Sequence, residues 1–294
     1  MTSAFTYADF VGRNAGFVTT AEQERLRNAS VFVCGVGGMG GAAVQSLARA
    51  GVGNLVIADM DRFEISNLNR QVFATLDTVG QQKTDATAAA IASINPEARV
   101  TIHGADWVDH LDDILQRERV VINGMDDVTA GVRLYRKARE HGATVIDAYT
   151  APLPSVTVVR PADPRPEERL RFPTRNREWR TITPADLDQC KLAEAIYVMV
   201  HSSSAKHIDL TVAMEMLAGT RSRPSFAPMV IASGTLMAFE ALKLLLGRPS
   251  GVGYRGVFLN PWTMRTEHPK PAPVAFVRER VARRFVRKLM ANAT

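Results

Sequence analysis

Residues 31–47 read VFVCGVGGMGGAAVQSL, a short apolar run that passes through a cluster of glycines into a helical pattern. Glycine tolerates a tight turn and leaves room for a phosphate to approach the backbone. Free amides and the helix dipole at the start of a helix attract an anion. The G-x-G-G-x-G motif therefore predicts a phosphate site built by Gly35, Gly37, Gly38 and Gly40.

The residues of this motif have separate expected roles. Gly35 is expected to make the tight turn, Gly37 to admit the phosphate, and Gly40 to let the helix pack closely on the strand. Asp59 ends the next apolar run, about twenty residues further on, where an acidic side chain can accept hydrogen bonds from ribose hydroxyls. Together these features predict a nucleotide site, with NAD, FAD and ATP all open.

The polar segment that follows favours one of these nucleotides. Residues 59–83 read DMDRFEISNLNRQVFATLDTVGQQK. A hydride-transfer enzyme needs an apolar slot for nicotinamide, whereas cations and amides near a helix N-terminus suit a triphosphate. We therefore expect ATP, contacted by polar residues of this segment: Asp61, Asn67, Asn69, Arg70, Gln71 and Lys83.

Two carboxylates follow a later strand, in the sequence VVINGMDD. The carboxyl end of a strand in an open α/β sheet lies at the ligand crevice, so Asp126 or Asp127 could hold Mg²⁺ through oxygen ligands. One of the two could instead cap the next helix. Both roles can be filled at once, one by each aspartate.

Strand and helix patterns alternate through the first half of the chain, which predicts parallel β-α-β units. Strands are expected at 31–34, 54–61, 98–106, 119–127 and 143–150, and helices at 20–29 (capped by Thr20 with Gln23), 40–50, 85–94 and 128–140. The fold class is therefore α/β, with a doubly wound, Rossmann-like and mainly parallel sheet. A smaller mixed extension follows, with helices near 203–218 and 228–247, a strand pair in 254–269 and a tail helix at 275–290.

Composition changes suggest five parts of the chain. They are an N-terminal arm and helix (1–30), a nucleotide-binding domain (31–160), an Arg/Pro-rich loop (161–190), a C-terminal part (191–270) and a basic tail helix (271–294). The Arg/Pro-rich loop is expected to be irregular and partly mobile, either solvated surface or a lid or substrate channel. The tail is amphipathic, and its apolar face is expected to dock on the body or on a second subunit; this face consists of Val277, Val281, Phe285 and Leu289.

Composition also bounds the class of protein. The 294 residues are 46% hydrophobic with a formal charge of +6, which suits a globular chain that attracts anions. No basic and apolar leader opens the chain, and the apolar stretch 227–239 is too short for a bilayer, so no membrane partner is expected. Two cysteines without a C-x-x-C motif predict neither disulfides nor a zinc site. We therefore expect a protein of the reducing cytoplasm. Two histidines, His201 and His207, are assigned no metal.

Several stretches together resemble the ThiF/MoeB/HesA family, the bacterial relatives of ubiquitin-activating enzymes. They include GVGGMGG, NLNRQ, TVGQQKTDA, INPEARV and NGMDD, and later GTLMAFEALKLLLGR and VFLNPWTMRTE. The resemblance covers residues 10 to about 160 and 225–268. The combination is far more specific than the glycine motif alone.

The resemblance implies ATP-dependent adenylation of a carboxylate, with Mg²⁺ and release of pyrophosphate. By matching position, Asp59 would bind the ribose, Arg70 and Lys83 would contact phosphates, and Asp126 would hold Mg²⁺. Arg13 matches an N-terminal arginine that reaches into the partner subunit's site in relatives, which implies a homodimer. The implied substrate is the C-terminus of a ubiquitin-like carrier or a peptide, or a small-molecule carboxylate, with a tRNA carboxylate less favoured.

The cysteines and two other function classes remain open at this stage. Cys34 lies inside the nucleotide-binding strand and is expected to pack there. Cys190 lies where some relatives keep a reactive cysteine, so it either packs as a small apolar residue or accepts an acyl group as a thioester. The alternatives to adenylation are an NAD- or FAD-dependent oxidoreductase on the same glycine turn and a non-catalytic scaffold of this fold.

Overall fold

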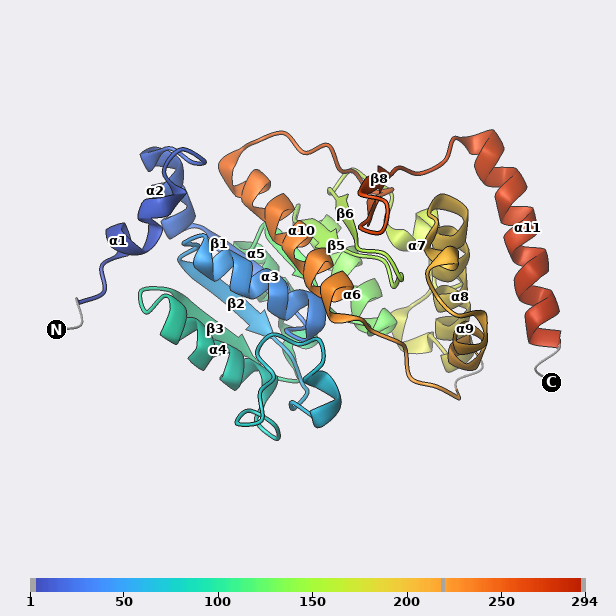
Figure 1. Ribbon diagram of the computed structural model, residues 1–294, viewed down its shortest axis with the longest axis horizontal. Helices are drawn as coiled ribbons and strands as arrows, with labels where there is room; N and C mark the ends of the chain where they lie inside the picture. Colours follow the sequence, from blue (N-terminus) through green and yellow to red (C-terminus); the bar gives the residue numbers. More distant parts are fainter. Residues whose placement is uncertain (1–3, 218–219, 292–294) are drawn as a thin grey trace.

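The computed structural model describes residues 4–217 and 220–291. Within these residues one eight-stranded sheet has the order β3-β2-β1-β4-β5-β6-β7-β8 (Figure 1). The strands are β1 Ser30–Cys34, β2 Asn54–Ala58, β3 Arg99–His103, β4 Val120–Asn123, β5 Thr144–Asp147, β6 Ser155–Val159, β7 Val257–Asn260 and β8 Arg265–Glu267. Strands β1 to β5 pair in parallel and β6 to β8 add antiparallel. The predicted doubly wound α/β sheet with a mixed extension is confirmed.

The described helices begin and end close to the predicted positions in the first half of the chain. They are α1 Tyr7–Val11, α2 Thr20–Asn28, α3 Gly38–Arg49, α4 Lys83–Ile94, α5 Leu111–Arg117, α6 Val128–Glu140, α7 Pro166–Arg169, α8 Pro184–His201, α9 Leu210–Leu217, α10 Ala227–Leu246 and α11 Ala272–Ala291. The predicted glycine stop of α10 is confirmed, because Gly247 takes a left-handed conformation with φ 67°.

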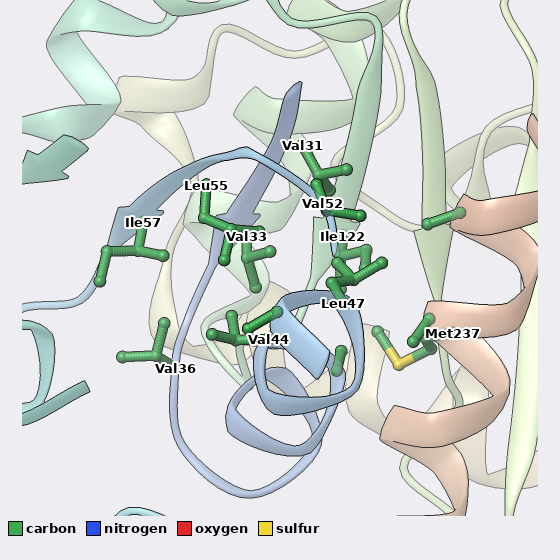
Figure 2. Close-up of a cluster of buried hydrophobic side chains, with 14 of the residues drawn as sticks. Val31, Val33, Val36, Val44, Leu47, Val52, Leu55, Ile57, Ile122 and Met237 are labelled. Carbon is green, nitrogen blue, oxygen red and sulfur yellow. The ribbon is translucent and has the colours of Figure 1, made fainter. Parts of the chain in front are cut away.

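Alternate side chains of β1 face opposite layers of helices. Val31 and Val33 belong to a core shared with α3 and α10, where Met237 packs (Figure 2). Phe32 and Cys34 point the other way, into a core shared with α5 and α6. Each such fully buried side chain contributes about 1.5–3 kcal/mol. Burial on both faces explains why the strand reads as an unbroken apolar run.

The connections place a crevice at the carboxyl ends of β1 and β4. After β1 the chain enters α3 on one face of the sheet, and after the neighbouring β4 it enters α6 on the other face. Adjacent strands whose helices leave on opposite faces form the switch point at which open α/β sheets bind ligands. The glycine turn and the two aspartates that follow β4 therefore meet at this edge.

Local details differ from the predictions at several places. Helix α2 is capped by Thr19 in a capping box with Glu22, one residue before the predicted pair. Helix α3 begins at Gly38 rather than at residue 40. The short elements α5 and β6 were not predicted, because seven and five residues give too little periodicity to identify. The predicted helix at 203–218 is instead a turn at Ser204–Lys206 followed by α9, and residue 218 lies outside the described residues.

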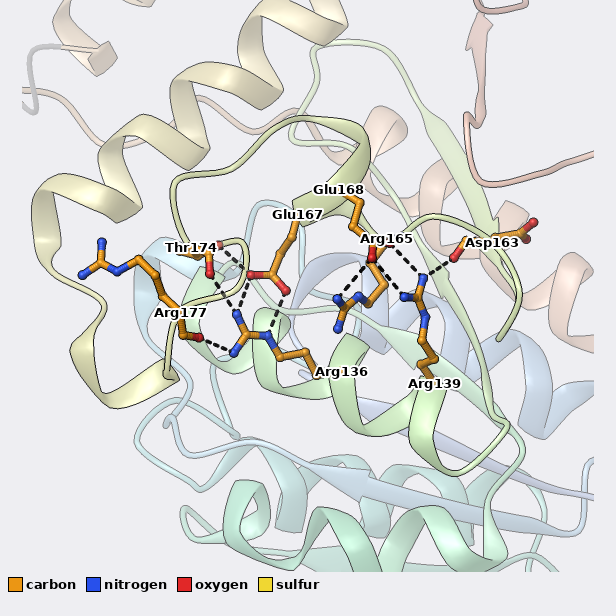
Figure 3. Close-up of polar contacts among 8 residues, drawn as sticks. All are labelled: Arg136, Arg139, Asp163, Arg165, Glu167, Glu168, Thr174 and Arg177. Carbon is orange, nitrogen blue, oxygen red and sulfur yellow. Dashed lines mark hydrogen bonds and ion pairs between the residues drawn. The ribbon is translucent and has the colours of Figure 1, made fainter.

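The Arg/Pro-rich segment differs from the mobile loop that we expected. It contains α7 and leads into α8, and ion pairs hold it on α6 (Figure 3). Arg136 donates two hydrogen bonds to Glu167, at 2.9 and 2.8 Å, and Glu167 is only 1% exposed. Arg139 pairs with Glu168 in the same way, at 3.0 and 2.9 Å. These arginines neutralise acidic side chains of the protein itself, so they do not form a free basic surface.

Helix α10 is longer than the apolar stretch at 227–239. With 20 residues it is the one helix of the described chain that is long and apolar enough to cross a membrane by those two criteria. The sequence argument that residues 227–239 are too short to cross a bilayer therefore applies to this apolar stretch and not to the whole helix. Helix α10 packs against α3 and β6, as the predicted buried helix would. Less than half of its most apolar 18-residue stretch is buried.

The tail helix docks on the body through a different face from the predicted one, and docking of the predicted face on a second subunit stays a prediction. Ala275 and Ala282 pack against α8, and Arg278 donates hydrogen bonds to the carbonyls of Met199 and Ser202. The predicted docking residues Val277 and Val281 are 61% and 64% exposed. The side chain of Leu289 lies outside the described residues.

Candidate active site

A cavity of about 420 Å³ opens at the carboxyl ends of β1, β2 and β4. This volume is within the roughly 300–1,000 Å³ that is usual for small-molecule sites. Its walls come from the glycine turn, the segment after β2, the start of α4, the residues after β4, and the connector before α10. The predicted residues that line it are Gly35, Gly37, Gly38, Asp59, Asp61, Asn67, Arg70, Gln71, Lys83, Asp126 and Asp127.

The glycine turn has the conformation that its sequence predicts. Gly35 has φ +80°, a region that side chains disfavour, and a Cβ there would lie 2.8 Å from the carbonyl carbon of Gly124. A Cβ on Gly40 would lie 1.7 Å from the carbonyl oxygen of Gly35. Gly40 itself does not line the cavity. Its role is thus the predicted close packing of helix on strand, and its assignment as a nucleotide contact is wrong.

Asp59 is held in place by the backbone on both sides of the cavity. Its two carboxylate oxygens accept hydrogen bonds from the amides of Val36 and Asp61, both at 2.9 Å. Burial raises the pKa of Asp59, and the two amides and Lys83 oppose that effect. Each oxygen retains a further lone pair, so the carboxylate can also accept a hydrogen bond from a ribose hydroxyl.

Two cations project into the cavity from the segment after β2 and from α4. The Lys83 side chain is 8% exposed, and its Nζ lies 2.8 Å from Asp61 Oδ2. Arg70 donates hydrogen bonds to the Ser66 carbonyl at 2.8 Å and to Asn69 Oδ1 at 2.9 Å. Asp61 therefore orients Lys83, while Arg70 keeps further N–H groups for a ligand.

The amide side chains of the segment after β2 have different roles. Gln71 is buried at the cavity, and its Oε1 has no hydrogen-bond partner among the described residues. Asn67 accepts from the Glu64 amide at 3.1 Å, which fixes the turn beside the cavity. Asn69 does not line the cavity and instead donates to the Ser225 carbonyl at 3.0 Å. The prediction that Asn69 contacts the nucleotide is therefore wrong.

The two aspartates after β4 divide the roles proposed for them. Asp127 caps α6 and accepts from the amides of Thr129 and Ala130 at 2.8 and 3.1 Å. Asp126 lines the cavity, and no hydrogen bond to its carboxylate occurs in the described chain. Magnesium at nucleotide sites is commonly bound by one or two carboxylates together with phosphate oxygens and water, so this lone carboxylate fits it. Residues 4–217 and 220–291 contain no cluster of three or more acidic, histidine or cysteine side chains placed to hold a metal.

Arg13 lies away from the cavity of its own chain. Its neighbour Asn14 donates to the carbonyl of Ala50, just past the C-terminal end of α3. The cavity lies at the other end of α3, and a helix of twelve residues spans about 18 Å. Arg13 is therefore not placed to act in its own cavity, and its predicted role in a partner's site stays a prediction.

Comparison with known proteins identifies the family. A family model described as the ThiF family matches residues 11–275. The chain belongs to the ThiF family. A tRNA threonylcarbamoyladenosine dehydratase of Bacillus subtilis (strain 168) is 52% identical over 77 residues, which are 26% of this chain and 30% of the relative. A molybdopterin-synthase adenylyltransferase of Salmonella typhimurium (strain LT2) is 48% identical over 79 residues, 27% of this chain and 32% of the relative. The chain thus spans about a third of the length of these relatives.

Solved structures of two other proteins share the fold. The tRNA N6-threonylcarbamoyladenosine dehydratase TcdA of E. coli has a TM-score of 0.58 and 21% identity, over 82% of this chain and 95% of that chain. MccB of E. coli, solved with ATP, has a TM-score of 0.60 and 18% identity, over 84% of this chain and 65% of that chain. At these identities the likeness establishes the fold alone.

Neither cysteine of this ThiF-family chain is placed to react. Cys190 is 1% exposed and packs with Leu170 and Phe172, and burial raises its pKa to about 11. A nucleophilic cysteine needs an accessible thiolate, so the packing interpretation holds and the thioester acceptor is a wrong prediction for the chain as folded. Cys34 is fully buried in the sheet and its thiol donates to the Ile122 carbonyl, as the predicted packing role requires.

Several cavity residues were not predicted because they come from distant segments. Trp107 and Met125 follow β3 and β4, while Arg223 and Val230 belong to the connector before α10 and to its first turn. No motif marks Arg223 in the sequence TRSRPSFAP. The one signal that could have found it is its position, because it directly precedes the helix that carries the family resemblance.

Proposed function

We propose that this chain is an ATP-dependent adenylyltransferase that activates a substrate carboxylate. The observation that carries the proposal is the composition of one cavity of about 420 Å³. It combines a glycine turn at the start of α3, the cations Arg70 and Lys83, and a buried Gln71 oxygen that lacks a partner in the described chain. Helix-terminal amides and cations suit phosphates, and membership of a family with a relative named as an adenylyltransferase supports the same reaction.

In the proposed reaction a carboxylate oxygen of the substrate attacks the α-phosphorus of ATP. A new oxygen–phosphorus bond forms, the bond from the α-phosphorus to the bridging oxygen breaks, and pyrophosphate leaves with the electron pair. The substrate carboxylate is already ionised at neutral pH, so no general base is needed. The protein therefore acts by positioning and by stabilising charge, with Asp59 on the ribose and Arg70 and Lys83 on the phosphates.

Magnesium is part of the proposal, and Asp126 is the residue that would hold it. The ion would offset phosphate charge. Because Asp127 is already engaged as a helix cap, it is not assigned to the metal.

A homodimer is also part of the proposal. Helix α10 and its N-cap expose three large apolar side chains: Phe226 (59%), Ile231 (37%) and Phe239 (58%). A second copy of the chain that covers them would remove this apolar surface from water. Such a dimer would allow Arg13 of one subunit to complete the cavity of the other.

The substrate classes that we propose are the C-terminal carboxylate of a carrier protein or peptide and the carboxylate of a modified tRNA base. The names of a molybdopterin-synthase adenylyltransferase and of a tRNA threonylcarbamoyladenosine dehydratase among the relatives support including both classes. A redox dinucleotide is the weaker candidate, because charged side chains, Arg70, Lys83 and Arg223 among them, line the cavity where nicotinamide needs an apolar slot.

The test is exchange of labelled pyrophosphate into ATP in the presence of candidate carboxylates. We expect Arg70→Ala and Asp126→Ala to lower the exchange rate at least 100-fold, because each removes charge stabilisation from the transferred group. Arg62→Ala is the matched control, since Arg62 is exposed on the same segment and does not line the cavity. Exchange by both site variants at the wild-type rate would show that the site is assigned wrongly.

A further inference from the structure

Arg223 extends the row of functional groups along the crevice by one position. The sheet order places β2, β1, β4 and β5 side by side. Asp59 follows β2, the glycine turn follows β1, and Asp126 lies beyond β4. The loop after β5 comes next, and Thr150 in this loop accepts a hydrogen bond from Arg223 Nη1 at 3.3 Å. Arg223 therefore borders the cavity at the end opposite Asp59.

Three segments far apart in the sequence meet behind Arg223. The connector before α10 carries Arg223, the loop after β5 supplies Thr150 Oγ1 to its guanidinium, and Glu194 of α8 holds Thr150. Glu194 is itself fixed, because its Oε1 accepts a hydrogen bond from the Thr150 amide at 2.6 Å. Arg223 lines the same cavity as Asp126 and Arg70.

The proposed reaction needs a cation at this end. Its two reactants are both anions, and the substrate carboxylate must approach the α-phosphorus from the side opposite the leaving pyrophosphate. Arg70 and Lys83 lie on the segments next to Asp59 and the glycine turn, where the phosphates of a bound nucleotide would use them. Arg223 is left on the β5 side, and a guanidinium is the side chain that binds a carboxylate in a bidentate manner.

We infer that Arg223 is the residue that binds the substrate carboxylate, and that Thr150, itself held by Glu194, positions its guanidinium. This inference rests on the proposed adenylation. It assigns carboxylate selection to the β5 loop, α8 and the connector before α10, and ATP binding to the segments around the glycine turn. Arg223 is a substrate-binding residue, and Thr150 is a positioning residue that acts through it.

The experiment separates ATP binding from carboxylate use in the full-length chain. ATP affinity is measured by calorimetric titration, and pyrophosphate exchange is measured over a panel of free amino acids, peptides and tRNA carboxylates. For any carboxylate that the wild type accepts, Arg223→Ala should raise its KM at least tenfold while the Kd for ATP changes less than threefold. Arg223→Lys should recover part of the loss, because it restores the charge without the bidentate geometry.

Two further variants test the positioning role and provide the control. Thr150→Val removes the hydroxyl that orients Arg223 and keeps the side-chain shape, so it should raise the KM for the carboxylate about threefold and leave kcat nearly unchanged. Arg221 is a cation of the same connector that pairs with Glu215 and does not line the cavity. Arg221→Ala should therefore change neither the KM for the carboxylate nor the Kd for ATP.

The outcomes distinguish the inference from the function on which it rests. A loss of ATP or inorganic pyrophosphate affinity in Arg223→Ala as large as that in Arg70→Ala would overturn the inference and leave adenylation standing. Unchanged constants in Arg223→Ala would overturn it as well. Binding of ATP by the wild type with no exchange for any carboxylate would overturn the proposed function and the inference together.

Discussion

At the scale of single residues, the glycine turn depends on contacts that exclude a side chain. The Cβ that any other residue would bring at position 40 overlaps the backbone of the turn, where no flexible side chain can move aside. The turn is also stabilised by Asp59, whose carboxylate accepts a hydrogen bond from the Val36 amide. The glycine turn at the cavity is thus held by contacts within the protein itself.

Substitution of Gly40 tests this packing. Gly40→Ala should destabilise the fold by about 1–3 kcal/mol in urea unfolding, because the backbone atoms that a Cβ would meet cannot move aside. Gly12→Ala is the matched control, since nothing lies within 4 Å of a Cβ at Gly12 and its φ is negative. Equal midpoints for the two variants would contradict the packing role of Gly40.

At the scale of elements, the Arg/Pro-rich segment is held on α6 by paired charges. The carboxylates of Glu167 and Glu168 each meet an arginine of α6 (Figure 3). A buried pair of this kind adds little net stability, but loss of one partner leaves the other charge uncompensated. The segment therefore depends on both members of each pair.

The pH dependence of stability reports on one of these pairs. A hydrogen bond from Arg139 is the main cause that lowers the pKa of Glu168 from 4.5 to about 2. A carboxylate with a lowered pKa stabilises the fold above its unfolded pKa, and this contribution disappears as the pH falls from about 4.5 towards 2. Glu168→Gln should therefore cost about 1–3 kcal/mol at pH 7, and the cost should shrink below pH 4.5.

Urea unfolding of the wild type and the variant between pH 3 and 7 measures this difference. Glu178→Gln, at an exposed position of the same segment, is the control and should show almost no cost at any pH. A cost for Glu168→Gln that stays constant down to pH 3 would indicate a role other than the ionised pair.

At the scale of the whole molecule, two helices of the described chain expose several large apolar side chains to solvent. One is α10, and the other is α11, which lies at the opposite end of the molecule from α1 and α2 (Figure 1). The proposed homodimer uses the exposed side chains of α10. Since Arg13 is remote from the cavity of its own chain, a dimer that presents it to the partner would make activity depend on assembly.

Matched phenylalanines on the two helices test the dimer. Phe239 on α10 and Phe276 on α11 are 58% and 57% exposed. Phe239→Asp should give a monomer by light scattering and lower pyrophosphate exchange at least tenfold, because a buried unpaired charge opposes association. Phe276→Asp should change neither quantity. A monomeric wild type would contradict the homodimer, and the reverse behaviour of the two variants would place the interface on α11.

The sequence by itself determined the parallel half of the sheet and about half of the residues that line the cavity. Strand β1, helix α6 and the glycine stop of α10 follow from apolar periodicity and from residues with local conformational preferences. The turn glycines and Asp59 follow from spacing, because a strand, a turn and a helix that are consecutive in the chain are also adjacent in space. Here local sequence and local structure carry the same information.

Only the tertiary structure decided which distant residues meet. Arg223 reaches the cavity because α10 packs on α3, and Cys190 is buried because the chain after α7 covers it with Leu170 and Phe172. The α6 arginines Arg136 and Arg139 are paired with Glu167 and Glu168 of the Arg/Pro-rich segment, which no spacing rule predicts. Contacts between segments far apart in the chain depend on how whole helices and strands pack, and the spacing of residues along the sequence does not describe that packing.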